Sequence, residues 1–175
     1  MSLYGASIET GLHCLVSLVN PPESGPPSTR ELAEFQGVSP SYVAKLFTKL
    51  AKAGLVASSE GIQGGFRLTK DPAKVSVWDV VSALEPDKLL FRCREIRRDF
   101  VLFDQKPPRW ATCGLCPIHA AMREAEKSMR RSLEAVTLAD IGNQVGNSVP
   151  KQFCEKSSDW FAERRSSRRD SKTPQ

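Results

Sequence analysis

Three cysteines and one histidine form the set of residues best suited to bind a metal. Cys113 and Cys116 are separated by two residues, and His119 follows three residues later. Two thiolates and an imidazole at this spacing can ligate one metal centre, either zinc or an iron–sulfur cluster. Nineteen residues separate Cys93 from Cys113, and Cys93 is the candidate for a fourth ligand. From residue types and spacing alone, zinc, a cluster and metal-free thiols all remain open.

The remaining cysteines and the second histidine offer little further chemistry. We expect Cys14, beside Leu15 on an apolar helix face, to lie in the core, and His13 to be a surface or packing residue. Cys154 is expected to be a free thiol. The total of five cysteines is odd, which argues against a disulfide scaffold. With two histidines, no phosphate-binding loop and no paired carboxylates, the sequence argues against an enzyme.

A second group of residues is suited to contact DNA. Lys45, Lys49 and Lys52 recur at spacings of four and three, which places them on one face of a helix predicted over 40–53. No acidic residue occurs within 36–53. Lysines on such a face can neutralise DNA phosphates and release counterions, although an ordinary solvated face has the same pattern. The residues expected to contact DNA here are Ser39, Ser41, Tyr42, Lys45 and Lys49.

Hydrophobic periodicity and capping residues predict the elements that must hold this helix. A short helix begins after Ser28, where Glu31 completes a capping box, and Ser39 and Pro40 open the lysine-bearing helix. In chain order we predict helices over 7–19, 29–35 and 40–53, strands over 55–57 and 66–68, and a helix over 77–84. This is the order of a winged helix-turn-helix, whose third helix enters the major groove. The predicted fold class is mostly α with a small β-hairpin wing.

The tip of the hairpin is the second place where we predict DNA contacts. Gly61, Gly64 and Gly65 have no side chains, so the backbone there can approach a phosphate or enter a minor groove. Arg67 follows the tip and can contact a phosphate. A plain hairpin without any ligand fits the same glycines.

A long helix is predicted from Pro117 to about Val136, and a short helix from Thr137 to about Val145. The apolar residues of the long helix recur at spacings close to a heptad seam, with charged residues between them. The seam consists of Ile118, Met122, Ala125, Met129, Leu133 and Val136. The spacing fits packing on the chain's own core and contact with a second subunit equally well.

Net charge does not by itself locate the DNA-binding part. The chain carries a formal charge of +5, but residues 1–84 hold seven basic and seven acidic residues. The excess lies toward the end, where residues 146–175 hold seven basic and four acidic residues. No run of eighteen apolar residues and no secretory signal occurs, which predicts a cytoplasmic protein without membrane contact.

Several strings together resemble one family of DNA-binding proteins. The string Ser39-Pro-Ser-Tyr-Val-Ala-Lys-Leu-Phe-Thr-Lys-Leu-Ala-Lys-Ala-Gly-Leu-Val is followed by Gly61-x-x-Gly-Gly-Phe-Arg-Leu. The later strings are Val77-x-Asp-Val-Val, Cys116-Pro-Ile-His119 and Thr137-Leu-Ala-Asp-Ile. Together they resemble the Rrf2 family of winged helix-turn-helix transcriptional regulators, especially its IscR-like and NsrR-like members. The resemblance covers about residues 7–145.

The resemblance implies a homodimer that forms through the long helix and binds a palindromic operator in double-stranded DNA. It also implies that Cys93, Cys113, Cys116 and His119 hold an iron–sulfur cluster, [2Fe–2S] or [4Fe–4S], with zinc as the alternative. The expected function is a repressor whose operator binding responds, through the cluster, to redox state, nitric oxide or iron status. The alternatives are a cluster-free or zinc-stabilised regulator and a winged-helix module for protein contacts.

Two features depart from the family pattern. Glu60 stands where the family usually has a basic residue, and the spacing between Cys93 and Cys113 exceeds the few residues usual in the family. The expected organisation is a winged DNA-binding domain over 1–84 and a cysteine-containing sensor loop over 85–116. A dimerisation helix and short terminal helix follow over 117–145. Residues 146–175 are expected to form a mostly disordered basic tail, in which Trp160 and Phe161 could anchor a brief helix.

Overall fold

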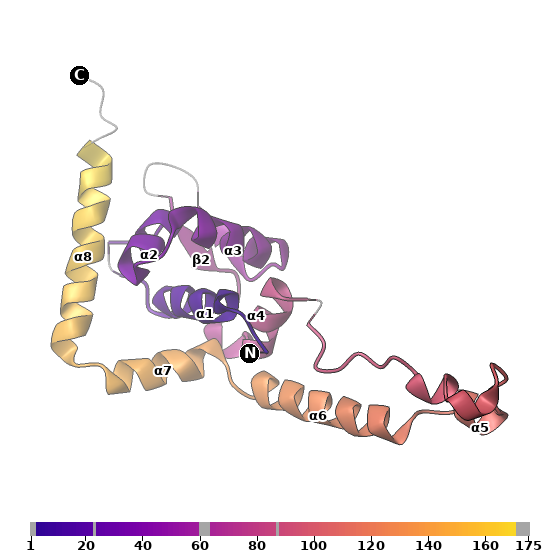
Figure 1. Cartoon of the computed structure of the whole chain (residues 1–175). Helices are drawn as coiled ribbons and strands as arrows, with labels where there is room; N and C mark the ends of the chain where they lie inside the picture. The colour runs from indigo at the N-terminus through magenta and orange to yellow at the C-terminus, as the bar shows by residue number, and fades with distance from the viewer. Residues whose placement is uncertain (1–2, 23, 60–63, 87, 171–175) are drawn as a thin grey trace. The chain divides into compact units, whose positions relative to one another are not determined.

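The structure is a computed structural model that describes residues 3–22, 24–59, 64–86 and 88–170. The chain divides into two compact units. Residues 1–86 and 133–175 form one, called here the winged unit, and residues 87–132 form the other, the cysteine unit. The helices are α1 Ala6–Val19, α2 Thr29–Gln36, α3 Pro40–Lys52, α4 Val77–Leu84, α5 Arg109–Thr112, α6 Pro117–Glu134, α7 Leu138–Ser148 and α8 Lys151–Asp170, and the strands are β1 Val56–Ser58 and β2 Phe66–Leu68 (Figure 1).

The first four helices begin and end within about one residue of their predicted bounds. The Ser28 side chain accepts from the Glu31 amide while the Glu31 carboxylate accepts from the Ser28 amide, so the capping box of α2 is formed. Gly37 ends α2 in the left-handed region, with φ of 66°, where a residue without Cβ is favoured. Pro40 opens α3 at its first position. The tight turn between α2 and α3 is therefore encoded locally.

The core of the winged unit lies between α1, α3 and α4. Leu15, Leu50 and Leu84 are fully buried, and they belong to one cluster with other apolar residues of the three helices. Cys14 is also fully buried, which confirms its place in the core. Burial raises the pKa of the Cys14 thiol to about 12, because a thiolate is poorly solvated in an apolar surrounding.

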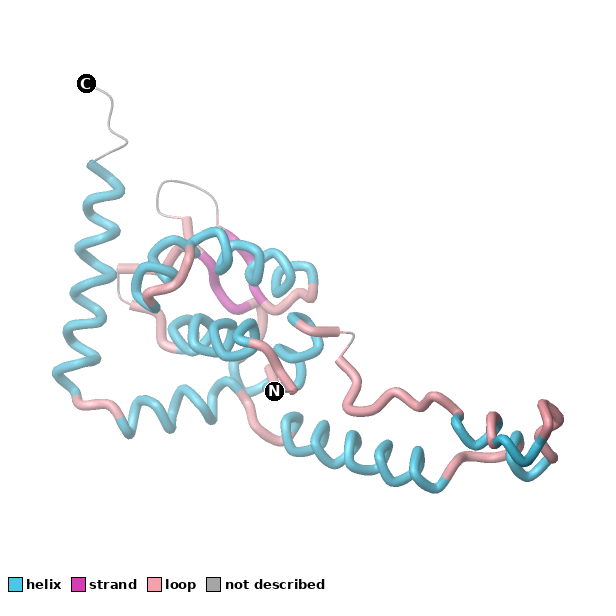
Figure 2. The backbone as a smooth tube through the Cα atoms, in the orientation of Figure 1, coloured by secondary structure: helices cyan, strands magenta, loops and turns pink. Residues whose placement is uncertain are grey.

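The wing is a two-stranded antiparallel ribbon (Figure 2). Val56 pairs with Leu68 and Ser58 with Phe66, so β1 begins one residue later than predicted. The ring of Phe66 meets that of Phe47 in α3 edge-on, with centroids 4.9 Å apart. The wing is thus packed directly on the lysine-bearing helix. The structure is mostly helical with one small sheet, as the sequence predicts.

Helix α7, which follows the cysteine unit in sequence, packs against the core of the winged unit. Thr137 caps it through a capping box with Asp140, and Leu138 is fully buried. The backbone just before α7 pairs with the segment before α4, because Val77 N donates to Val136 O at 2.8 Å and Leu138 N to Val75 O at 2.9 Å. The short helix predicted from Thr137 is present and extends to Ser148.

The segment after α7 differs from the predicted disordered tail. It forms the 20-residue helix α8, which lies beside α2 (Figure 1). Phe161 and Arg165 of α8 are only 6% and 7% exposed. The expectation of disorder rested on a polar composition, whereas a few aromatic side chains at helical spacing suffice to bury one face of α8.

The cysteine unit contains short helices where the sequence predicts irregular backbone. The 3₁₀ turns are Ile96–Arg98 and Val101–Phe103, and α5 follows them. Phe103 packs edge-on against Trp110 with centroids 5.5 Å apart, and Ala111 is fully buried. The long helix α6 begins at Pro117 as predicted. In the part of the chain that the structure describes, no helix is long and apolar enough to cross a membrane.

Candidate functional site

Helix α3 presents the residues predicted to contact DNA. Ser39, Ser41, Lys45 and Lys49 are exposed, while Tyr42 is half-buried and packs against the core. The hydroxyl oxygens of Ser39 and Ser41 are 2.9 Å apart, so the start of α3 offers two adjacent hydroxyls. No acidic residue occurs within α3. The exposed face is therefore polar and basic, as a helix in a DNA groove requires.

The two central lysines of α3 differ in what they contact. Lys49 Nζ donates to the carbonyl oxygen of Leu84 at 2.8 Å. Among the residues that the structure describes, the Lys45 side chain has no hydrogen bond or ion pair. Its ammonium group is available to a phosphate, whereas that of Lys49 already has a partner within the protein.

The predicted wing residues also differ in whether they are exposed or packed within the chain. Arg67 is exposed on β2, opposite Ala57. Gly65 is buried, and a Cβ there would overlap the carbonyl oxygen of Pro26. The glycine at 65 is thus explained by close packing within the chain. Gly64 is half-buried, while Gly61, like Glu60, lies outside the described residues.

One group of possible metal ligands forms in the cysteine unit. The ligand atoms of Cys93, Glu95 and His119 all lie within 4.8 Å of one another. Glu95 was not among the predicted ligands, which were all thiolates or an imidazole. The feature of the sequence that could have indicated Glu95 as a ligand is its position two residues after Cys93. Cys113 and Cys116 do not belong to this group, so the structure joins two of the four predicted ligands.

One ring nitrogen of His119 is buried without a hydrogen-bond partner among the described residues. Its Nδ1 is inaccessible to solvent and has no hydrogen-bond partner among the described residues. A buried imidazole nitrogen without a partner costs free energy. A metal ion is one partner that such a nitrogen can have, and the thiolate, carboxylate and imidazole donors of Cys93, Glu95 and His119 fit zinc or iron.

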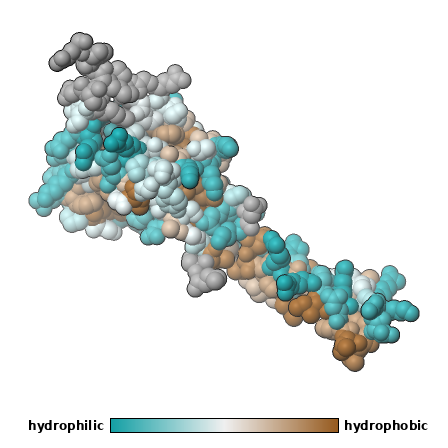
Figure 3. Space-filling view, turned by 45° about the horizontal axis from the view of Figure 1, so that its top comes forward, coloured by the Kyte–Doolittle hydropathy of each residue, from teal (hydrophilic) through white to brown (hydrophobic). Residues whose placement is uncertain are grey.

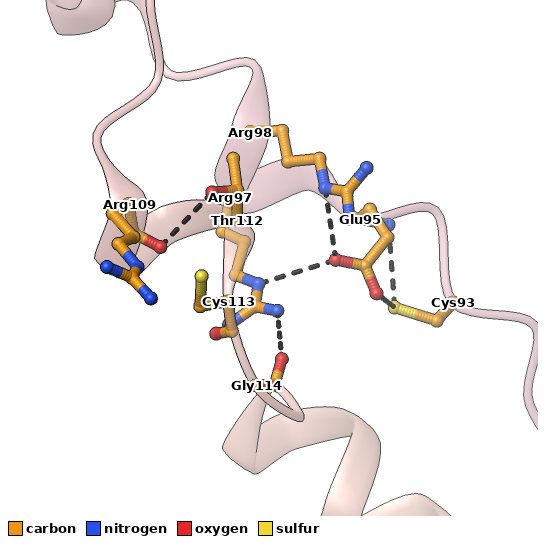
Figure 4. A network of polar contacts seen from close by, with 8 residues as sticks. All are labelled: Cys93, Glu95, Arg97, Arg98, Arg109, Thr112, Cys113 and Gly114. Carbon is orange, nitrogen blue, oxygen red and sulfur yellow. Dashed lines mark hydrogen bonds and ion pairs between the residues drawn. The ribbon is translucent and has the colours of Figure 1, made fainter.

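Glu95 is the centre of a polar network that links the two cysteine segments (Figure 4). Its amide donates to Cys93 Sγ at 3.4 Å, and its carboxylate accepts from Arg97 Nε at 3.4 Å. Arg97 also donates to the carbonyl oxygens of Cys113 at 3.4 Å and Gly114 at 2.5 Å. Arg97 therefore holds the Cys113 turn beside the Cys93 segment.

The charge of this network favours the ionised form of Glu95. Partial desolvation acts to raise the pKa of the carboxyl, but the hydrogen bond and positive charge of Arg97 outweigh it, with smaller contributions from Cys93 and Arg98. The pKa of Glu95 is consequently lowered from its ordinary value. The carboxylate is thus available as a metal ligand at neutral pH, in competition with the arginines.

The apolar seam of helix α6 is only partly covered. None of its residues is buried, and Ile118 is 68% exposed. Apolar side chains are also visible at the surface of the cysteine unit in Figure 3. Leu133, at the other end of the seam, packs against the core of the winged unit. Ile118 and Ala125 of the seam are therefore open to solvent in the single chain, whereas Met122 is half-buried.

Comparison with known proteins places these features in a family context. Residues 4–144 match the Rrf2 family, described as "Iron-dependent Transcriptional regulator". The chain is 31% identical over 144 residues to Protein rrf2 of Nitratidesulfovibrio vulgaris, covering 82% of this chain and 89% of that protein. It is 33% identical over 121 residues to the HTH-type transcriptional regulator IscR of Cronobacter sakazakii, covering 69% and 68%.

Solved structures show the same fold. The structure of T. potens IscR aligns with a TM-score of 0.62 at 26% identity, covering 84% of this chain and 91% of that chain. CymR, the global cysteine regulator of B. subtilis, aligns with a TM-score of 0.56 at 24% identity, covering 82% and 98%. At that identity the second likeness concerns the fold alone.

Proposed function

This chain belongs to the Rrf2 family of DNA-binding transcriptional regulators, and from that premise we propose that it is a dimeric, cytoplasmic repressor controlled by a metal centre. The centre we propose is an iron–sulfur cluster held by Cys93, Cys113, Cys116 and His119. The observation that carries the proposal is the position of His119 beside Cys93, because a ring nitrogen of His119 and the Cys93 sulfur lie within 4.8 Å of each other. The relatives in this family are transcriptional regulators rather than enzymes.

DNA binding is assigned to α3 and the wing. Lys45 and Arg67 would contact phosphates, which position the protein, while Ser39 and Ser41 lie at the helix start where base edges are read. The polar, acid-free face of α3 supports this assignment. A palindromic operator follows if two copies bind through a twofold axis.

Dimerisation is assigned to α6. Its seam is apolar and periodic, and Ile118 and Ala125 are exposed in the single chain. Burying such a seam against a second copy removes apolar surface from water, at about 25 cal/mol per Å². The ion pairs of Glu124 with Lys127 and Arg131 lie on the charged part of the same helix.

A cluster bound in the cysteine unit would supply a redox-active, oxidant- and nitric-oxide-sensitive centre. The residues of this chain would orient it: His119 lies at the start of α6, and Cys93 lies in the segment that follows α4 in sequence. Cys113 is at present held by its carbonyl oxygen to Arg97. Recruiting both Cys113 and Cys116 requires this turn to change its contacts.

A single divalent ion is the second candidate, and one observation favours it. Cys93, Glu95 and His119 already lie within the reach of one ion, whereas Cys113 and Cys116 lie outside the group. Zinc bound by these three residues with a fourth ligand would stabilise the loop without redox chemistry.

The test is anaerobic purification followed by iron and sulfide analysis and a visible absorbance spectrum. An operator can be selected from random duplexes with the metal-loaded and metal-free protein. We expect a brown protein with iron and sulfide, and different operator affinities for the two forms, because only a difference in affinity can drive a switch. Equal affinities contradict sensing, and zinc without sulfide favours the second candidate.

A further inference from the structure

Helix α8 lies beyond residues 4–144 that match the family, yet it is firmly packed on the winged unit. Phe35 of α2 lies under three aromatic rings of α8, with centroids 6.5 Å from Phe153, 5.4 Å from Trp160 and 4.9 Å from Phe161. Trp160 and Phe161 meet edge-on at 5.0 Å. Such tilted and edge-on pairs add to the gain from burial. The first helix of the helix-turn-helix is therefore covered by the end of the chain.

Arg165 is the residue through which α8 reaches the loop between α1 and α2. It is 7% exposed, and its guanidinium donates to the carbonyl oxygen of Pro26 at 3.1 Å. Gly25 has φ of 109°, and a side chain there would overlap the Arg165 guanidinium. A proline carbonyl in a loop has no helical or sheet partner of its own, so a buried arginine donor supplies one.

The same loop holds the base of the wing. Phe66 N, at the start of β2, donates to Pro27 O at 2.9 Å, and Pro27 is fully buried. Gly65 lies so close to Pro26 that a Cβ would overlap its carbonyl oxygen. Contacts thus run without a break from Arg165 through Pro26 and Pro27 to the first residues of β2.

The wing needs an anchor of this kind. Each of its strands has three residues, and an isolated two-stranded ribbon is marginally stable at best. Its position therefore depends on the contacts at its base, which include the Phe47 ring, the buried Val56 side chain and the Pro26–Pro27 backbone. If that backbone shifts, the wing shifts relative to α3.

We propose that Arg165 is a positioning residue for DNA binding, through which α8 fixes the wing at the orientation that the operator requires. The inference rests on the family's DNA-binding function and extends it to a helix outside the matched residues. Arg165 acts through the Pro26–Pro27 loop and does not itself contact DNA. The C-terminal helix thereby becomes a determinant of operator affinity.

The test compares Arg165→Met with Arg164→Met in the full-length protein. Both variants lose one positive charge from the same helix, but Arg164 lies over the Trp160 ring at 5.2 Å and 3.6 Å from Glu34. Two quantities are measured: hydrogen exchange of the Phe66 amide, and affinity for the selected operator across a salt series.

For Arg165→Met we expect at least about tenfold faster exchange of the Phe66 amide, with the amide of Leu50 in the core unchanged. Operator affinity should fall about fivefold or more, and the slope of log K against log salt should stay the same, because no phosphate contact is lost. Arg164→Met should leave the Phe66 amide and the affinity within about twofold of the parent.

Three outcomes overturn the proposal. Equal losses of affinity in both variants would mean that net charge alone matters. A shallower salt slope in Arg165→Met alone would make Arg165 a phosphate contact. Unchanged exchange at Phe66, or faster exchange at Phe66 and Leu50 alike, would show that Arg165 does not hold the wing specifically. If Arg165→Met does not fold, Arg165→Lys is measured by the same criteria, because it keeps the charge but replaces the planar guanidinium with an ammonium group. A parent protein that binds no duplex would contradict the DNA-binding function, while the exchange measurement would still test the coupling.

Discussion

The ammonium nitrogen of Lys49 lies 2.8 Å from the carbonyl oxygen of Leu84. Leu84 is the last residue of α4, so its carbonyl has no partner within the helix. A lysine at this end also interacts favourably with the helix dipole. The contact joins α3 to α4, and it distinguishes Lys49 from Lys45, which have the same spacing signal in the sequence.

The first prediction concerns these two lysines. Lys45→Ala should weaken binding to any duplex and reduce the salt slope by about one, because it removes one phosphate contact. Lys49→Ala should lower the free energy of unfolding by about 1 kcal/mol through the lost hydrogen bond, with a smaller effect on the salt slope. Salt-dependent fluorescence anisotropy and urea unfolding measure the two effects. Lys151→Ala on α8 is the control for loss of charge, and equal salt slopes for Lys45→Ala and the parent would contradict the assignment of α3.

The second prediction concerns the subunit contact. Ala125→Asp places a charge in the middle of the exposed seam of α6 and should weaken the dimer about a hundredfold or more, since an unpaired charge would be buried. Arg123→Asp introduces the same side chain on the charged face of the same helix and should leave the dimer intact. Sedimentation velocity over a concentration series distinguishes the two. We avoid Leu133 for this purpose because it also packs against the winged core. A dimer unaffected by Ala125→Asp would exclude this seam.

The third prediction concerns Gly65. Replacing it with alanine forces the added Cβ against Pro26, and overpacking of this kind costs about 1–3 kcal/mol. Gly146→Ala is the matched control, because nothing lies within 4 Å of a Cβ at that helical position. It should be neutral or stabilising by up to about 1 kcal/mol. Thermal unfolding measures both, and a neutral Gly65→Ala would show that the wing base yields without cost.

The fourth prediction concerns thiol reactivity. The unfolded Cys14 thiol has a pKa near 9.0, and burial raises the pKa of the folded thiol to about 12. This group therefore contributes stability that is fully present below pH 9 and is lost as the pH rises toward 12.

At pH 8, iodoacetamide should modify exposed Cys113 and Cys154 in the native, metal-free protein and should modify Cys14 only after unfolding in urea. Mass spectrometry of the peptides reads out each site, and rapid native labelling of Cys14 would contradict its burial.

The fifth prediction separates the two metal candidates. Glu95→Gln should lower zinc affinity about tenfold or more if Glu95 is a ligand, and should leave iron and sulfide content unchanged if a cluster uses the cysteines and His119. Cys116→Ala should do the reverse, with Cys154→Ala as the control. Zinc titration and iron and sulfide analysis after anaerobic reconstitution give the answer. Loss of both metals in Glu95→Gln would mean that the two sites share this carboxylate.

Much of the winged unit was predictable because its signals are local. The capping boxes at Ser28 and Thr137, the proline at the start of α3 and the glycine after α2 each act within one turn of helix. The apolar period of each helix specifies which face is buried. For these reasons the order of elements, the start of α6 at Pro117 and the burial of Cys14 all follow from the sequence.

The remaining features depend on residues far apart in the chain. Arg165 meets Pro26 across 139 positions, and no local pattern reveals that a polar segment has such a partner. Lys49 and Lys45 have the same spacing signal, and only the end of α4 distinguishes them. Glu95 enters the ligand group because His119 is brought beside it. Local preferences determine the helices of the winged core from α1 to α4, whereas the burial of α8 and the partners of Arg165, Gly65 and His119 are decided when segments far apart in the sequence pack together.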